Sequence, residues 1–136
     1  MSPRFAGAAT ALVLLTACGA DAPSATVKVG PSGTYALRTV SGAPLPYVSE
    51  RSQMSVSEVI DESLTLGTVG DFVDTYHLRT TTNGVATTAP VTEVGTFTLS
   101  DVDITLRYPA GVRVSGTLRG DSLKVTDDGI ALVYVR

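Results

Sequence analysis

From residue 33 onward, apolar and polar residues alternate along the chain in short segments. Such alternation is typical of strands with one buried face, because successive side chains in a strand point to opposite faces of the sheet. No segment shows the 3.6-residue periodicity of an amphipathic helix, so the pattern indicates an all-β fold. The predicted strands cover residues 34–41, 54–66, 71–80, 92–100, 101–107, 112–118, 123–125 and 130–135.

Turn signals separate these segments at short intervals. Asn83-Gly84 is typical of a two-residue hairpin, and residues 127–129 read Asp-Asp-Gly. Pro44 and Pro46 exclude a central strand at that point of the chain. Short connections make neighbouring strands antiparallel, and closing such a meander removes its two exposed edges. We therefore expect an antiparallel up-and-down barrel of about eight strands, with a β-sandwich as the alternative.

The alternation is imperfect in residues 54–66. Most apolar residues there fall on even positions, but Glu58 and Glu62 have the same parity. A β-bulge near these acidic residues would explain the fault, and so would two shorter strands in place of one.

Bulky residues of matching parity form the predicted interior. The residues that we expect to line the barrel interior or a ligand are Tyr35, Leu37, Phe72, Tyr76, Leu99, Leu106 and Tyr134, and Ile104, Leu118 and Leu132 complete the inward set. These are many large side chains for a narrow barrel, so both a small cavity and a filled interior remain open.

Composition limits the class of protein. The 136 residues suffice for one domain, and the net charge of −3 argues against a nucleic-acid binder, which would carry a basic patch. The content of apolar β-branched residues argues against disorder. A single Cys excludes an internal disulfide framework and a multi-cysteine zinc site.

The N-terminal segment has the layout of a secretory signal peptide. Arg4 precedes an uncharged apolar run over residues 5–15, and small residues follow. The run is shorter than the roughly 20 residues that a transmembrane helix needs. We expect a signal peptide over residues 1–17, a flexible tether over residues 18–32 and the folded domain over residues 33–136.

The four residues that end at Cys18 read Leu-Thr-Ala-Cys and resemble the lipobox of bacterial lipoproteins. The resemblance implies that the Cys18 thiol carries a diacylglyceryl group, that residues 1–17 are removed, and that the new amine is acylated. It implies a membrane anchor in the bacterial cell envelope, on the periplasmic side or at the cell surface. Gly19, rather than Asp, follows Cys18, so an outer-membrane location is permitted.

A second resemblance covers most of the folded part. Residues 33–42, which begin Gly-Thr-Tyr, and the proline-containing loop after them look like the first strand of lipocalin-like domains in bacterial lipoproteins. Residues 116–125 and 132–136 are similar to the end of such domains. The resemblance implies an antiparallel barrel that holds an apolar molecule. It also implies that Tyr35 plugs the base of the barrel and makes Arg136 the candidate for the late arginine that packs on this aromatic ring.

Catalytic signatures are absent from the sequence. His77 is the only histidine, and its place opposite Phe72 and Tyr76 in a predicted strand suggests an exposed or rim position. There is no Gly-x-Ser-x-Gly motif for a serine nucleophile and no metal-binding spacing of His or Cys. We therefore expect neither an enzyme nor a protein with a cofactor or metal.

Acidic residues offer the only other candidate chemistry. Asp71 and Asp74, or Glu58, Asp61 and Glu62, could form an acid pair or a weak cation site. Solvated strand ends are the simpler interpretation of all five residues.

These observations favour a membrane-anchored envelope lipoprotein whose barrel binds a small apolar ligand for transport or sequestration. The alternative is a protein–protein interaction or inhibitor module with a filled barrel and no ligand. We expect a monomer whose partners are the membrane, through lipidated Cys18, and the small ligand, with no role for nucleic acid.

Overall fold

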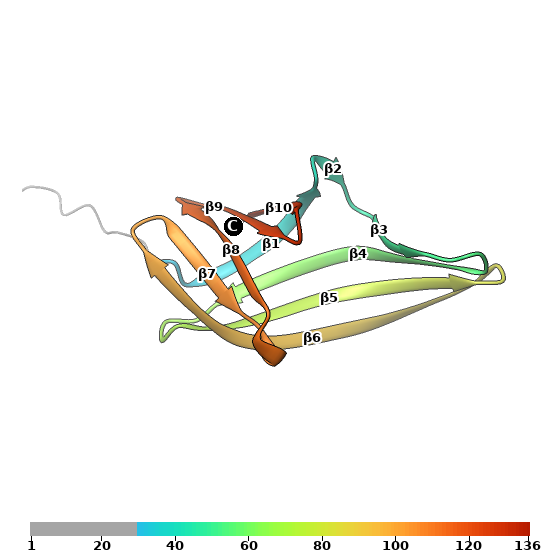
Figure 1. Ribbon diagram of the computed structural model, residues 1–136, viewed down its shortest axis with the longest axis horizontal. Helices are drawn as coiled ribbons and strands as arrows, with labels where there is room; N and C mark the ends of the chain where they lie inside the picture. Colours follow the sequence, from blue (N-terminus) through green and yellow to red (C-terminus); the bar gives the residue numbers. More distant parts are fainter. Residues whose placement is uncertain (1–29) are drawn as a thin grey trace, which may run out of the picture.

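The computed structural model describes residues 30–136, and this part of the chain is built from antiparallel strands (Figure 1). One short 3₁₀ helix, η1 (Pro109–Gly111), interrupts them. The strands are β1 (Gly33–Val40), β2 (Ala43–Pro44), β3 (Tyr47–Arg51), β4 (Ser55–Leu66), β5 (Asp71–Thr82), β6 (Val85–Ser100), β7 (Asp103–Arg107), β8 (Arg113–Arg119), β9 (Ser122–Asp127) and β10 (Ile130–Val135). The all-β prediction is therefore confirmed.

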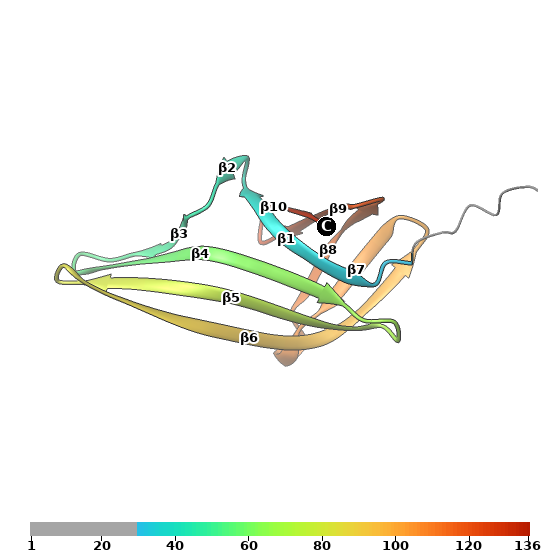
Figure 2. The ribbon, with the colours of Figure 1, turned by 180° about the vertical axis from the view of Figure 1, so that it is seen from behind.

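Pairing between β1 and β4 closes the sheet into a barrel. Consecutive strands from β4 to β10 are neighbours, β10 pairs with β1, and β1 pairs with β4 from Gly33↔Leu66 to Ala36↔Ser63. This closed order of eight antiparallel strands confirms the up-and-down barrel and excludes the β-sandwich. Figure 2 shows β1 on the near side of the barrel, alongside the end of β4.

Two short strands were not predicted. β2 pairs with the second half of β1, beyond the stretch that β4 covers, and β3 pairs with the first half of β4. Pro44 therefore lies in an edge strand, as the proline rule requires. β3 escaped prediction because Ser49, Glu50 and Arg51 are all polar, and all three are exposed, so the segment shows no alternating pattern.

The strands β4, β5 and β6 extend well beyond the barrel (Figure 1). β5 pairs with β6 along its full length through the predicted hairpin, where Asn83 and Gly84 have φ of 51° and 80°. β6 begins at Val85, seven residues before its predicted start. Among the described residues, no strand pairs with the other side of β6 before Thr96, and Pro90, which has no N–H group, is tolerated at this free edge.

A β-bulge in β4 explains the irregular pattern of its sequence. The register with β5 shifts between Val59 and Asp61, so Ile60 has no direct partner. The extra residue turns Glu58 to the outer face and leaves Glu62 on the inner face, although both have even numbers. Of the two explanations offered by the sequence, the bulge is correct.

The hydrophobic core fills one end of the barrel, which we call the closed end. This end contains the start of β1, the end of β10 and the β4–β5, β6–β7 and β8–β9 turns. The core residues are Tyr35, Leu37, Val40, Leu64, Leu66, Phe72, Phe97, Ile104, Leu106, Val114, Leu118, Leu123, Val125 and Tyr134. The opposite end, where β9 meets β10 and η1 follows β7, is called the open end below.

Leu99 was wrongly assigned to the interior. Its side chain is 37% exposed, whereas Phe97, two residues earlier on the same face of β6, is buried. Phe97 lies within the packed layer, and Leu99 lies next to the β6–β7 turn, where the strand ends at Ser100. The alternation gave the correct face but not the depth of Leu99 within the barrel.

At the closed end of the barrel, Arg136 contacts residues just before β1 and within it. Its guanidinium lies 4.8 Å from the centre of the Tyr35 ring, and its Nη2 atom donates to the Tyr35 hydroxyl at 2.7 Å and the Ser32 carbonyl at 2.7 Å. The Tyr35 hydroxyl in turn donates to the carbonyl of Pro31 at 2.8 Å. This contact corresponds to the arginine–aromatic packing that the resemblance implied for these two residues.

Gly33 leaves the space that this contact needs. Its φ of 143° disfavours any residue with a side chain, and a Cβ atom there would lie 2.9 Å from Nη2 of Arg136. The glycine that opens β1 is thus required by the close approach of the guanidinium.

We predict that Arg136→Lys destabilises the barrel by about 1–2 kcal/mol, because lysine keeps the charge but loses the planar, multiply donating contact with Tyr35 and the preceding carbonyls. Urea unfolding followed by far-UV circular dichroism measures the change. Arg113→Lys, at an exposed position of β8, is the matched control and should stay within about 0.5 kcal/mol of the parent. Equal effects of the two substitutions would show that Arg136 contributes only charge.

Candidate ligand-binding cavity

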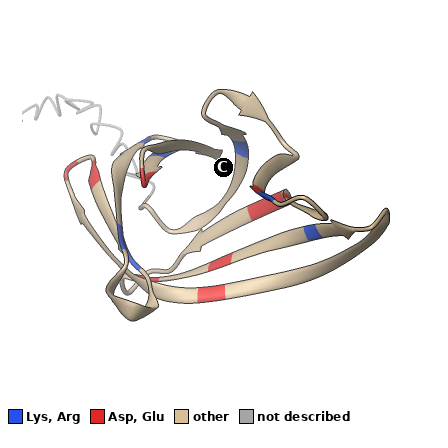
Figure 3. Cartoon of the chain, turned by 45° about the vertical axis from the view of Figure 1, so that its right-hand side comes forward, with Lys and Arg blue, Asp and Glu red and all other residues tan. Residues whose placement is uncertain are grey.

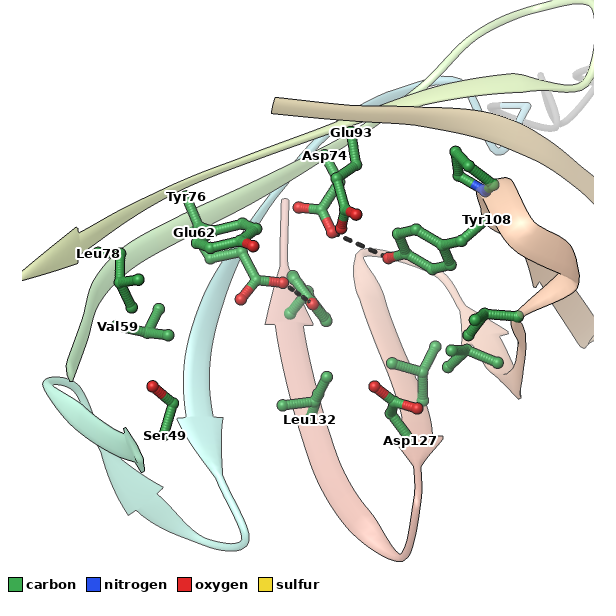
Figure 4. A pocket seen from close by; sticks show the side chains of 15 residues that line it. Ser49, Val59, Glu62, Asp74, Tyr76, Leu78, Glu93, Tyr108, Asp127 and Leu132 are labelled. Carbon is green, nitrogen blue, oxygen red and sulfur yellow. Dashed lines mark hydrogen bonds between the residues drawn. The ribbon is translucent and has the colours of Figure 1, made fainter. Parts of the chain in front are cut away.

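A cavity of about 400 Å³ occupies the open end of the barrel, between the long strands β4–β6 and the strands β8–β10 (Figure 4). It is lined by Ser49, Val59, Glu62, Asp74, Tyr76, Leu78, Glu93, Tyr108, Pro109, Val112, Val114, Val125, Asp127, Leu132 and Tyr134. A smaller cavity of about 160 Å³ adjoins it and extends toward Leu37, Val40 and Tyr47. The two share Ser49, Val59, Glu62, Asp127 and Leu132 in their walls.

Strand alternation and the β4 bulge position the polar residues of the cavity. On β5, Asp74 lies on the inner face between buried Phe72 and Tyr76. Its partner across the β5–β6 pairing is Glu93, which also faces inward. Glu62 is brought to the same wall by the bulge and pairs with Tyr76. Three adjacent strands thus each contribute one carboxylate to one wall.

Asp74 lies at the bottom of the cavity, above the core. It is 4% exposed, and its Oδ2 atom accepts a hydrogen bond of 2.9 Å from the Tyr108 hydroxyl. The Tyr108 ring is held edge-on against Phe72, with 4.8 Å between the ring centres. The Oδ1 atom of Asp74 is buried and has no hydrogen-bond partner among the described residues. A buried polar atom without a partner costs about 1–3 kcal/mol of stability, so this arrangement calls for an explanation.

Glu62 is a second carboxylate of the cavity, and it is partly buried. It accepts a hydrogen bond from the hydroxyl of Tyr134, a buried residue of β10. Figure 4 shows Glu62 and Asp74 on the same side of the cavity, with the Tyr108 hydroxyl reaching Asp74 from the opposite side. Glu93 is half-buried beside Asp74, and Asp127 lies exposed at the rim.

The cavity has a strongly acidic character. Its lining, as far as the described residues form it, holds carboxylates but no Lys, Arg or His. Burial, followed by the charge of Asp74, raises the pKa of Glu62 to about 7. Burial also raises the pKa of Asp74 to about 6, with Glu93 adding to the rise and the Tyr108 hydrogen bond opposing it. Figure 3 shows acidic positions in red on the long strands β4, β5 and β6.

Glu58 and Asp61 lie on the outer face, and each contacts a side chain of β5. Glu58 pairs with Arg79 at 2.8 Å, and Asp61 lies 2.6 Å from Nδ1 of His77. His77 is 44% exposed, which confirms its predicted position on the outer side of β5. The group of Glu58, Asp61 and Glu62 is thus divided by the bulge, and only Glu62 reaches the cavity.

In the structure, the residues predicted to face the interior are found in three places: the cavities, the packed core and the exposed end of a strand. Tyr76 and Tyr134 line the larger cavity, and Leu37 lines the smaller one. Tyr35, Phe72 and Leu106 belong to the packed core beneath. Leu99 lies outside the interior, as described above. The predicted lipidation site, Cys18, the signal peptide and the tether up to residue 29 lie outside the described residues.

Several cavity residues were not recognised from the sequence. The interpretation of Asp74 as a solvated strand end is wrong, because it is almost completely buried, whereas Asp71 is exposed as expected. The parity that Asp74 shares with Phe72 and Tyr76 was the available signal. Glu93, Tyr108 and Asp127 were not considered as site residues, because a turn or an unpredicted strand pairing brings each of them to the cavity.

The cavity lacks the features of a metal centre. Within residues 30–136, no group of three or more His, Cys, Asp or Glu side chains is arranged to hold a metal ion.

No helix of this part of the chain has the length and apolar character needed to span a membrane. The chain matches no protein-family model and no curated protein.

We predict that the barrel loses stability as the pH rises from about 4 to about 7. The pKa values of Glu62 and Asp74 are raised above those of an unfolded chain, so the folded state binds more protons in this window and its unfolding free energy falls as the pH rises. Asp74→Asn should flatten the fall in Tm between about pH 4 and about pH 7, measured by thermal unfolding. Asp103→Asn, at an exposed position of β7, should keep the slope of the parent. A slope unchanged in Asp74→Asn would contradict the assigned role of burial.

Proposed function

We propose that this protein is a binding protein whose barrel holds one small molecule with an apolar body at its open end. The observation that supports the proposal is the cavity of about 400 Å³ in a barrel whose other end is fully packed. Ligand cavities in proteins are typically about 300–1,000 Å³, with apolar walls and a few polar groups. Val59, Leu78, Val114 and Leu132 provide such walls here.

The division of the barrel into a packed end and a hollow end favours ligand binding over the alternative of a filled interaction module. Arg136 and Tyr35 seal the closed end, so a molecule enters between the long strands and the β9–β10 turn. A filled module would have no need of the unpartnered oxygen on Asp74. The proposal assigns no catalytic step to the protein.

We further propose that Cys18 anchors the protein to a membrane of the bacterial envelope. This part of the proposal is supported by the sequence alone, through the short apolar run and the Leu-Thr-Ala-Cys motif. One acyl chain holds a protein only marginally, whereas two or more chains on one residue make release slow. The barrel would then carry its ligand close to the membrane surface.

Native mass spectrometry of the full chain, purified from a bacterial host, tests the binding proposal. The parent should carry a bound small molecule or gain thermal stability from a panel of compounds with an apolar body. Leu78→Trp fills the cavity mouth with a larger ring and should reduce binding by about tenfold or more. Leu99→Trp, outside the cavity, is the matched control and should bind like the parent.

Two results would contradict the binding proposal. One is a parent protein that neither carries a small molecule nor responds to the compounds. The other is equal binding by Leu78→Trp and Leu99→Trp while circular dichroism shows both to be folded. A protein captured on the barrel in the first case would instead support the interaction module.

The anchor is tested by Cys18→Ser. We expect the parent to be in the membrane fraction and to incorporate an alkyne analogue of palmitate, since the cysteine thiol and the amine are the acylated groups. The serine variant should lose the label and leave the membrane fraction. Retention of both label and membrane association in the serine variant would show that Cys18 is not the anchor.

A further inference from the structure

We propose that the ligand is an organic cation, an apolar body bearing a protonated amine that donates to the free Oδ1 atom of Asp74. The inference rests on the proposed function and specifies the chemical class of the molecule that it binds. It is supported by the geometry of the cavity bottom, where a buried carboxylate oxygen lacks a partner.

The position of Asp74 distinguishes it from an ordinary surface acid. Asp74 lines the cavity, its Oδ2 atom is already hydrogen-bonded to Tyr108, and its buried Oδ1 atom has no partner among the described residues. The Tyr108 ring is itself fixed against Phe72. One oxygen of this carboxylate is therefore held, and the other has no donor until the ligand supplies one. A hydrogen bond from a charged donor to a carboxylate is about twice as strong as a neutral hydrogen bond.

The neighbouring groups select the charge of that donor. Glu62 and Glu93 flank Asp74 on the adjacent strands, and Asp127 lies at the rim. The described residues of the lining offer no basic side chain to balance them. An anionic ligand would be repelled, and a neutral ligand would leave the negative charges unbalanced. A cation both satisfies the Oδ1 atom and compensates the charge.

The cavity walls select an organic cation over a bare metal ion. Valine and leucine side chains surround the carboxylates, and the described residues contain no metal-holding cluster. Tyr76 adds an aromatic ring to the wall that carries the carboxylates, and rings of this kind attract cations through their faces. An amine on an apolar body matches both the charged and the apolar parts of the lining.

Proton release should accompany binding. In the free protein the pKa of Glu62 is about 7 and that of Asp74 about 6, so both carboxyls are partly protonated near neutral pH. A bound cation favours their ionised forms, and the affinity should therefore fall as the pH is lowered through this range. The titratable groups that face the site are Glu62 from β4, Asp74 and Tyr76 from β5, Glu93 from β6, Tyr108 before η1, Asp127 from β9 and Tyr134 from β10.

Three probes with the same ring system test the inference. They are 1-naphthylmethylamine, 1-naphthalenemethanol and 1-naphthoate, which are cationic, neutral and anionic near about pH 8. Isothermal titration calorimetry with the full chain measures each affinity. We expect the amine to bind about tenfold to hundredfold more tightly than the alcohol, and the acid to bind most weakly. Lowering the pH to about 5 should weaken the amine but not the alcohol.

Substitution of the proposed contact provides the second arm of the experiment. Asp74→Asn should abolish the preference for the amine over the alcohol while it keeps the binding of the alcohol, which depends on the apolar walls. Asp103→Asn, far from the cavity on β7, removes the same charge from the chain and should keep the preference. Circular dichroism establishes that each variant is folded.

The outcomes separate this inference from the proposed function. If the amine and the alcohol bind equally to the parent, the cavity is a ligand site but the cation assignment is wrong. If Asp74→Asn keeps the full preference for the amine, Asp74 is not the contact and the inference is also overturned. If none of the three probes binds, the inference is overturned, whereas the proposed function is decided separately by native mass spectrometry and the wider panel of compounds.

Discussion

One extra residue in β4 decides which side chains face the interior of the barrel. β4 pairs with β1 at one end and with β5 along its length, so its register is fixed from both sides. Ile60 is the residue that this pairing cannot accommodate, and the resulting bulge lets Val59 and Glu62 face the cavity while Glu58 and Asp61 face outward. Without the bulge, either the apolar residues or the acidic residue of this wall would point to solvent.

The side chains that face the interior differ in character between the two ends of the barrel. At the closed end, large apolar side chains pack beneath the ring of Tyr35 and the guanidinium of Arg136. At the open end, Asp74 and Glu62 occupy positions that apolar residues would otherwise take. Buried carboxyls with raised pKa values lower the stability of the folded chain near neutral pH, and the packed end offsets this loss. Active and binding sites commonly carry such local destabilisation.

Alternation in the sequence predicted the fold because each barrel strand has one face on the interior, and the parity of Phe72, Tyr76 and Tyr134 was sufficient to place them inside. It did not predict depth, since Leu99 has the correct face but lies at the end of its strand. The acidic cavity was missed because a carboxylate in an alternating pattern is normally assigned to solvent. The bulge at Ile60 and the pairing of Asp74 with Glu93 depend on neighbouring strands, which local patterns do not specify.

The unpaired margin of β6 has a consequence for how copies of this chain meet in solution. Before Thr96, the described residues offer no strand to cover its outward amide and carbonyl groups, and an uncovered margin of this kind is a template for sheet growth between molecules. Pro90 interrupts that template in the middle of the exposed stretch, since it cannot supply the hydrogen that an added strand would need. Pro90 thus limits the sheet growth that the free margin of this long hairpin would otherwise favour.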